Sequence, residues 1–331
     1  MQKNIEVRNI EVHKNEKYDI FEPYITIITP IYNRQKTIKR TLASVEKQSY
    51  RNFEHIIVDD GSTDSVDDIV FEYMKCTNLP VMYIKKQNGG VHTARNMAIS
   101  HARGDFLLAL DSDDELVPNA LQVFYDTWQQ IPVEKRGDYR EIVAQCMNEN
   151  GDRVGLMFPD NINDVSWNQA QKMVRATHGE HFGYYVTKIL KDNPWPEPEG
   201  VTFVTENILW NKLACTYKSW FINDTLRIYH QEGDDHLSGG HQTKTLQSCR
   251  NALWEDTYRL KYWNIYGTTV ENYFKTVVRY CIMSQILKQN KDKFYSTYKL
   301  VHVRDNICKV ALWIPSFFGA LIYTRIKMKD V

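Results

Sequence analysis

Four acidic residues follow a short apolar segment, and their types and spacing suit metal chemistry. Residues 106–110 are entirely apolar, and Asp111, Asp113, Asp114 and Glu115 come directly after them. Carboxylates gathered this closely disfavour one another's charge unless a counter-charge lies among them. Mg²⁺ and Mn²⁺ prefer carboxylate oxygens, and Mg²⁺ usually shares its shell between one or two carboxylates and substrate phosphates. The cluster therefore predicts a site where Mg²⁺ or Mn²⁺ is the counter-charge and bridges to a diphosphate.

The spacing of the four acids divides their tasks. Asp111 and Asp113 are two residues apart, so in an extended segment their side chains point to the same side. One of them can bind a metal while the other binds a ligand hydroxyl. Asp114 and Glu115 also suit a helix that begins near Pro118, where acids stabilise the helix N-terminus. Whether Asp114 belongs to the metal site therefore stays open.

Three other polar loops carry residues that suit a nucleotide ligand. The loop "TPIYNR" offers Tyr32 as an aromatic face for stacking and Arg34 as a cation near phosphates. The loop "VDDGSTD" offers Asp60 as an acceptor for N–H groups and Gly61 for a tight turn, although an Asp-Gly pair is equally typical of an ordinary turn. The segment "NGGVHTARN" starts a helix after two glycines, as an anion-binding helix start does, and places Arg95 in its first turns.

The elements that must position these loops alternate along the chain. Short apolar segments rich in β-branched residues predict strands, and "TIKRTLASVEKQ" and "VHTARNMAISHA" between them have helical spacing. This order indicates parallel β-α-β units, in which ligands bind at the carboxyl ends of the strands. We therefore expect an α/β fold with a mostly parallel central sheet and one site at its edge. The expected strands are 24–29, 53–58, 81–84 and 106–110, followed by the less regular "EIVAQC" and "TLRIYH".

The C-terminal part of the chain differs in composition. From about residue 243 the sequence predicts helices rich in Tyr, Trp and Leu. Residues 310–323 carry no charge, but they are fewer than the roughly 20 that span a bilayer, and Pro315 interrupts them. They suit either a buried terminal helix or a segment lying in a membrane interface with basic residues near the headgroups. The expected domains are an extension at 1–23, a catalytic domain at 24–235 and a helical region at 236–331 that contains the candidate interface segment 310–329.

Overall composition excludes some classes of protein. The 331 residues include 41 Lys plus Arg and 41 Asp plus Glu, so the net charge is zero and a general nucleic-acid binder is not expected. The six cysteines are scattered without metal or redox spacing, which favours reduced thiols and a cytoplasmic location. The N-terminus lacks the apolar core of a signal peptide.

Residues 24–126 closely resemble the family 2 glycosyltransferases of the GT-A fold. The resemblance rests on "ITIITPIYNR", "SVEKQSYRNFEHIIVDDGSTD" and "QNGGVHTARNMAISHARGDFLLALDSDDELVPNAL" in this order. It implies a metal-dependent, inverting transfer from a nucleotide-diphosphate sugar, most commonly a UDP-sugar. It further implies that Asp111 faces the ribose or sugar, that Asp113 binds Mn²⁺ or Mg²⁺, and that the nucleotide contacts Thr29, Pro30, Tyr32, Arg34, Asp60, Gly61 and Arg95.

The resemblance is incomplete at the general base. The family usually has a Glu-Asp pair at the start of a helix after the sheet, whereas this chain has Glu206 followed by Asn207. Because Asn cannot accept a proton at neutral pH, either Glu206 is the base, or the base lies elsewhere, or activity is reduced. His230, at the end of "TLRIYH", is a candidate third metal ligand beside Asp113 and Asp114. His178 and His181 are candidate neighbours of the acceptor, without an assigned mechanism.

The sequence thus predicts a glycosyltransferase on the cytoplasmic face of the membrane. Its acceptor would be a glycan or lipid-linked glycan in cell-surface polysaccharide biosynthesis, with peripheral membrane contact through the C-terminal segment. A nucleotide-sugar-binding or scaffold protein that has lost catalysis is the alternative, which the Glu206-Asn207 departure favours slightly. A nucleotidyltransferase is less favoured because "TPIYNR" lacks the glycines of a triphosphate loop.

Overall fold

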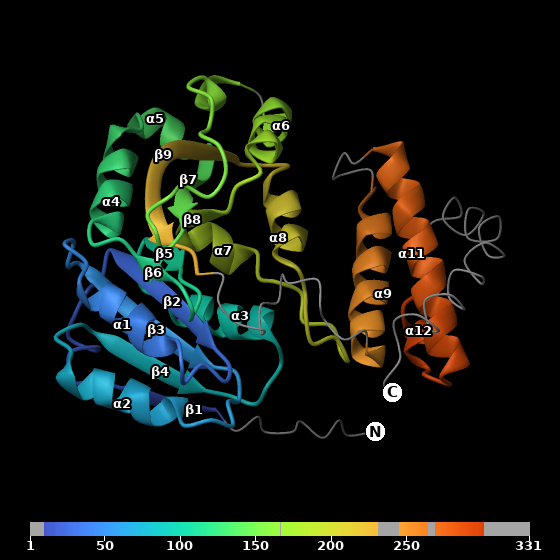
Figure 1. Cartoon of the computed structure of the whole chain (residues 1–331), viewed down its shortest axis with the longest axis horizontal. Coiled ribbons are helices and arrows are strands. Elements are labelled where there is room, and N and C mark those ends of the chain that lie inside the picture. Colours follow the sequence, from blue (N-terminus) through green and yellow to red (C-terminus); the bar gives the residue numbers. More distant parts are fainter. Residues whose placement is uncertain (1–9, 166, 231–244, 264–268, 301–331) are drawn as a thin grey trace. The chain divides into compact units, whose positions relative to one another are not determined.

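The computed structural model describes residues 10–165, 167–230, 245–263 and 269–300 (Figure 1). The chain divides into two compact units, which are described separately below. The first unit comprises Met1–Pro194 and Thr216–Glu232, and the second comprises Trp195–Cys215 and Gly233–Val331. The second unit thus includes 195–215, which the expected boundary at 235 assigned to the catalytic domain. The candidate interface segment 310–329 lies outside the described residues.

The first unit is built on a nine-stranded sheet with the order β1-β4-β3-β2-β5-β8-β7-β9-β6. Its four central strands, β4, β3, β2 and β5, are parallel, while β8 pairs antiparallel with both β5 and β7. The strands expected from the sequence are present, whereas β1, β6 and β8 were not expected. Glu115, which the sequence placed with the following helix, lies in β6. The bounds are β1 Glu11–Lys14, β2 Ile25–Ile31, β3 Phe53–Asp59, β4 Val81–Lys85, β5 Phe106–Ala109, β6 Glu115–Leu116, β7 Tyr139–Met147, β8 His181–Val186 and β9 Lys218–Ile228.

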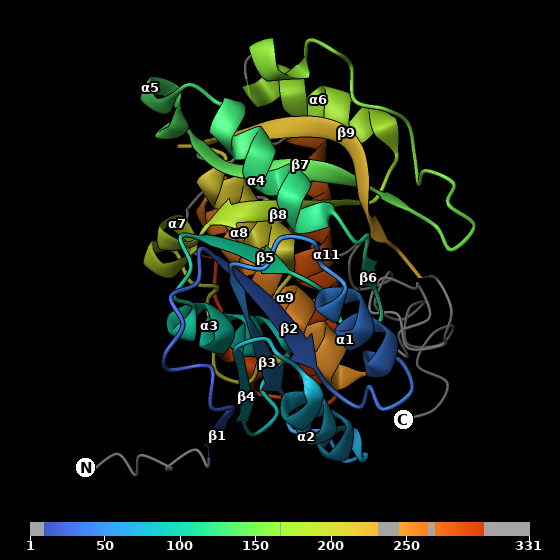
Figure 2. The same ribbon diagram turned by 90° about the vertical axis from the view of Figure 1, so that its left-hand side faces the viewer.

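Helices cover both faces of this sheet. The apolar stripe that the sequence predicts on α1, formed by Ile38, Leu42 and Val45, is buried in the main hydrophobic core. Helices α2 and α4 contribute to the same core and cover the same face of the sheet, while α3 packs on β2 and β3 from the other side (Figures 1 and 2). The helices of this unit are α1 Ile38–Glu46, α2 Val66–Cys76, α3 Val91–His101, α4 Ala120–Gln130, α5 Val133–Arg136, α6 Trp167–Thr177 and α7 Thr187–Asp192, with a 3₁₀ turn at Ile162–Asp164.

The strand order creates a switch point between β2 and β5. From β2 the chain continues to β3 on one side, and it later adds β5 on the other side. The loops after β2 and β5 therefore leave the sheet next to each other, which is where open α/β sheets bind ligands. The acidic cluster follows β5, so the fold brings it to this position.

The second unit is helical among its described residues. Its elements are α8 Glu206–Leu213, α9 Leu246–Lys261, α11 Val270–Gln289 and α12 Phe294–Thr297. Thr245 and Thr269 cap the starts of α9 and α11 through their hydroxyl oxygens, and the two helices share an apolar core. Within that core the buried carboxylate of Asp256 pairs with Arg279. Across the described part of the chain, no helix is long and apolar enough to span a membrane.

Candidate active site

The loops after β2 and β3 are joined by reciprocal hydrogen bonds. The Asn33 backbone N–H donates to the hydroxyl of Ser62 at 2.9 Å, and the Asn33 side-chain oxygen accepts from the Thr63 N–H at 2.8 Å. The Gln35 N–H donates to Asp64 at 2.9 Å. Asn33 holds a left-handed backbone with φ of 53°, which Asn tolerates better than most residues. The two loops thus form one edge of the switch point, and Tyr32 stands on it with 47% of its surface exposed.

Asp60 connects the second of these loops to the start of α3. Its carboxylate accepts hydrogen bonds from the Gly89 and Gly90 N–H groups at 2.9 and 2.7 Å and from the ammonium of Lys86. Both side chains of this ion pair are only 4% exposed. Gly61 follows with φ of 81°, and a Cβ there would lie 2.8 Å from the Asn88 nitrogen, so the turn requires glycine. In the structure, the Asp60 carboxylate, which the sequence analysis assigned to the nucleotide, therefore fixes the glycine loop before α3.

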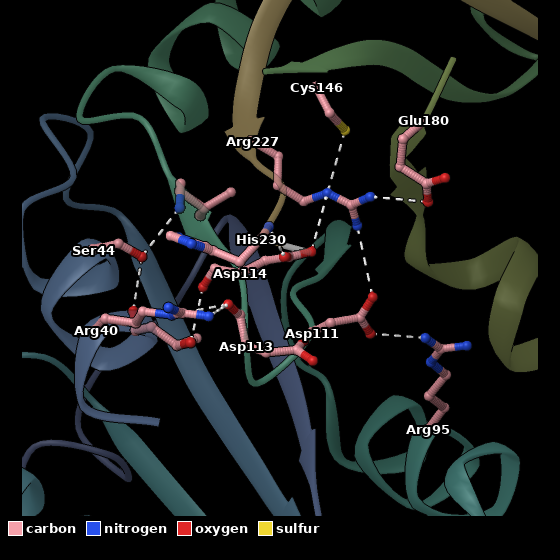
Figure 3. A network of polar contacts seen from close by, with 12 residues as sticks. Arg40, Ser44, Arg95, Asp111, Asp113, Asp114, Cys146, Glu180, Arg227 and His230 are labelled. Atoms are coloured by element: carbon pink, nitrogen blue, oxygen red, sulfur yellow. Dashed lines mark hydrogen bonds and ion pairs between the residues drawn. The ribbon is translucent and has the colours of Figure 1, made fainter. Parts of the chain in front are cut away.

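Helix α1 holds the backbone of the acidic turn after β5. The Arg40 side chain donates twice to the Asp113 carbonyl oxygen, at 3.0 and 2.6 Å, and the Thr41 hydroxyl donates to the Asp114 carbonyl at 2.8 Å (Figure 3). The Leu116 N–H donates to the Ser44 hydroxyl. Sequence reasoning missed these α1 residues, although polar groups on the otherwise apolar face of a helix signal buried partners. Their hydrogen bonds fix the backbone from which the acidic side chains project.

Asp111 lies between two arginines from different elements. Arg95 on α3 places its Nη2 atom 3.0 Å from Asp111 Oδ1, and Arg227 on β9 places its Nη1 atom 3.6 Å from Oδ2 (Figure 3). Arg34 lies nearby, with Nη2 3.9 Å from Asp113 Oδ2. The acidic cluster therefore has arginine counter-charges within the protein, in addition to the metal that its sequence predicts. The side chains of Asp111 and Asp113 remain 41% and 21% exposed, so a ligand can reach both.

Asp114 is placed differently from its two acidic neighbours. It is 1% exposed, its Oδ1 accepts from the His230 N–H at 3.0 Å, and its Oδ2 lies 3.4 Å from Arg227 Nε. Burial raises the pKa of Asp114 to about 7, against the opposing effects of Arg227 and the His230 hydrogen bond. Both oxygens are thus engaged with the protein, which favours a structural role over the metal ligation considered from the sequence.

Arg227 is another residue that sequence reasoning missed. Its side chain is 5% exposed and contacts Asp111, Asp114, Glu180 Oε1 at 3.2 Å and Cys146 Sγ at 3.3 Å. Burial acts to lower its pKa, but the surrounding groups raise the pKa overall, so Arg227 keeps its charge. An arginine between Leu226 and Ile228, inside a strand sequence, is the signal that points to a buried acidic partner.

The structure places the remaining predicted residues in β2, just after β9 and at the start of α8. Thr29 and Pro30 lie within β2 and are buried. The Thr29 hydroxyl pairs with His55 Nε2 at 2.9 Å, so its hydrogen bond lies within the sheet. His230 is 7% exposed and its Nε2 atom lies 2.8 Å from Glu115 Oε1. Glu206 belongs to the second unit, where it is the first residue of α8 and its Oε2 lies 3.4 Å from Trp210 Nε1. Its role as general base stays a prediction.

The described residues offer a partial metal shell. Among them no group of three His, Cys, Asp or Glu side chains is close enough to hold an ion, and Asp113, Asp114 and His230 do not form such a group. Asp113 supplies an exposed carboxylate, and Mg²⁺ typically takes one or two carboxylates from a protein when phosphates and water complete its shell. The donor set therefore fits a metal shared with a diphosphate and does not fit an all-protein metal site.

The first unit has a GT-A-type α/β fold, with its polar loops gathered at the switch point of the sheet. Residues 26–134 match the family model "Glycosyl transferase family 2". For this part of the chain, the match confirms the resemblance to the family 2 glycosyltransferases that the sequence motifs predict.

Three known proteins illustrate the similarity. "Glycosyltransferase GlyG" of Streptococcus pneumoniae is 36% identical over 106 residues, 32% of this chain, but these span only 35% of that relative. "GalNAc(5)-diNAcBac-PP-undecaprenol beta-1,3-glucosyltransferase" of Campylobacter jejuni is 23% identical over 311 residues, 89% of this chain and 93% of that relative. The crystal structure of S. aureus TarS 1-349 in complex with UDP-GlcNAc has a TM-score of 0.52 at 19% identity, covering 91% of each chain, and it supports the fold alone.

Proposed function

We propose that this protein transfers a sugar from a nucleotide-diphosphate donor, a UDP-sugar, to a hydroxyl group of a glycan or lipid-linked glycan. The observation that carries the proposal is the placement of Asp111 and Asp113 at the switch point, exposed yet held by Arg95, Arg227 and α1. Two acids fixed at that edge and flanked by arginines suit a ligand with both a metal-bound diphosphate and sugar hydroxyls. The named donors and acceptors of the similar proteins support the same substrate classes.

The proposed chemistry is a single displacement with inversion. Asp113 would hold Mn²⁺ or Mg²⁺, which would stabilise the charge that develops on the leaving diphosphate. Asp111 orients the ribose or sugar, and Arg34 adds positive charge beside Asp113. Glu206 removes the proton of the acceptor hydroxyl as general base. No covalent sugar–enzyme intermediate is required. We place the activity in cell-surface polysaccharide biosynthesis at the cytoplasmic face of the membrane, with peripheral contact through 310–329.

A screen of nucleotide sugars tests this proposal. UDP-, GDP- and dTDP-sugars are incubated with the protein, with and without Mn²⁺, and release of the nucleoside diphosphate is measured. We expect metal-dependent release from a UDP-sugar. Release that is equal without metal would contradict the role of Asp113, and tight UDP binding without turnover of any sugar would instead support the alternative of a catalytically impaired nucleotide-sugar-binding protein.

A further inference from the structure

Glu180 and Asp111 are held by the same guanidinium group. Arg227 places Nη1 3.6 Å from Asp111 Oδ2 and Nη2 3.2 Å from Glu180 Oε1 (Figure 3). Glu180 immediately precedes β8, whereas Asp111 follows β5, so two acids from neighbouring strands meet at one planar cation. Their carboxylates are thus separated by no more than the width of a guanidinium and two polar contacts.

The arginine of this cluster is buried, whereas the two carboxylates that it contacts are partly exposed. Arg227 is 5% exposed, whereas Glu180 is 46% and Asp111 is 41% exposed. The buried Asp114 already gives Arg227 an acidic partner within the protein. The positive charge of Arg227 therefore does not require Glu180 and Asp111 as further partners at its solvent side. They do create a pair of fixed acceptors that face solvent beside the acidic turn.

The backbone before Glu180 is also fixed in an unusual conformation. His178 has a left-handed φ of 49°, which is uncommon for residues other than glycine. A Cβ at Gly179 would lie 2.6 Å from the Val154 carbonyl oxygen, so this position accepts only glycine. The Leu156 N–H donates to the Thr177 carbonyl at 2.8 Å, which fixes the backbone just before this turn. The turn therefore presents Glu180 from a rigid support.

We propose that Glu180 is a further substrate-binding residue, which accepts a hydrogen bond from a hydroxyl of the transferred sugar, and that Arg227 is the positioning residue for Glu180 and Asp111. This rests on the proposed function, in which Asp111 faces the ribose or sugar of the donor. Ionised carboxylates only accept hydrogen bonds, and sugars present several hydroxyl donors on one ring. Two acceptors held on one guanidinium suit two hydroxyls of the same ring.

The test is Glu180→Gln, with Glu46→Gln as a matched control. Glu46 is a 40% exposed glutamate that also pairs with an arginine, Arg51 at 3.5 Å, on α1 away from the acidic turn. The probes are UDP and the UDP-sugar found in the screen, both with Mn²⁺. We expect Glu180→Gln to bind UDP within twofold of wild type and to weaken binding of the UDP-sugar about tenfold, as loss of one charge-assisted hydrogen bond predicts. The control should match wild type with both probes.

Two results would overturn the proposal. Unchanged UDP-sugar binding and hydrolysis in both Glu180→Gln and Glu180→Ala would remove Glu180 from the sugar site, and an equal loss of UDP binding would indicate only a general disturbance of the loops. Glu180→Ala provides a second variant if the amide retains the contact, and thermal unfolding of each variant separates misfolding from lost binding. If wild type binds neither probe, the proposed function fails instead, whatever the Glu180 variants do.

Discussion

Arg227 Nε lies 3.4 Å from Asp114 Oδ2, and this buried ion pair joins the last long strand of the sheet to the acidic turn. The two side chains are 5% and 2% exposed. The same guanidinium also contacts Asp111 and Glu180, so the position of β9 in the sheet determines where these two exposed acids are held. The site is therefore supported by a strand that lies more than a hundred residues after the cluster in the sequence.

Replacing Arg227 by Met should destabilise the protein strongly. The variant leaves Asp114 buried without its cation, and removing one partner of a buried ion pair costs about 3–5 kcal/mol. Urea unfolding of both proteins at the same pH measures the change in the free energy of unfolding. Arg51→Met is the control, because Arg51 is 47% exposed and its surface pair with Glu46 contributes about 0–1 kcal/mol. Equal stabilities of the Arg227 and Arg51 variants would contradict a structural role for the buried pair.

Asp113→Asn should remove the dependence of donor hydrolysis on metal. The amide keeps the shape of the side chain but lacks the charge that Mn²⁺ or Mg²⁺ requires. We expect hydrolysis to fall at least about a hundredfold, the scale of removing one electrostatic contact to a leaving group. Asp138→Asn, in an exposed pair with Lys218, should behave as wild type. Retention of metal-stimulated hydrolysis by Asp113→Asn would show that another residue binds the ion.

Glu206→Gln should lower turnover far more than it lowers donor affinity. A general base acts on the acceptor proton in the transition state, and its loss typically reduces turnover about 10²–10⁴-fold. The measurement is kcat and KM for transfer, with UDP affinity as the check on the donor site. Glu271→Gln is the matched control in the same unit, because Glu271 is exposed and paired with Lys275. Wild-type turnover in Glu206→Gln would require a different base.

His55 gives a pH dependence of stability that can be measured separately. Burial lowers the pKa of His55 to about 3, so the folded protein keeps the ring neutral while the unfolded chain protonates it below about 6.5. The stabilisation is therefore fully present above about pH 6.5 and is lost as the pH falls towards 3. We expect wild type to lose about 1.4 kcal/mol per pH unit more than His55→Asn between about pH 6 and 4. Urea unfolding of both proteins across this pH range measures the two slopes, and equal slopes would contradict the buried neutral ring.

The sequence predicts the first half of the fold well because its signals are local. Short apolar segments define β2 to β5, the spacing of Ile38, Leu42 and Val45 defines α1, and each strand ends in a polar loop. In a parallel sheet the loops that follow the strands lie at one edge, so their common location follows from the strands themselves. By contrast, β8 contains Gly183 and two tyrosines in a short segment, so its pairing between β5 and β7 depends on tertiary contacts.

The contacts within the site were less predictable because they join residues distant in sequence. Arg227 meets Asp111 and Asp114 only after β9 has joined the sheet, and Lys86 meets Asp60 only once β3 and β4 pair. Residue types alone therefore suggested that Asp60 contacts the nucleotide and Asp114 the metal, while the structure shows both carboxylates engaged with the protein. Asp111 and Asp113, which remain exposed, are where the prediction of ligand binding has its strongest support.

Titration calorimetry of UDP into the wild-type protein, with and without Mn²⁺, tests the central claim most directly. If Asp113 and a metal hold the diphosphate at the switch point, UDP should bind at least about tenfold more tightly with Mn²⁺, and uridine, which lacks the diphosphate, should show no such gain. UDP binding that is unaffected by Mn²⁺, or no UDP binding under either condition, would contradict a metal-dependent UDP-sugar site at Asp111 and Asp113.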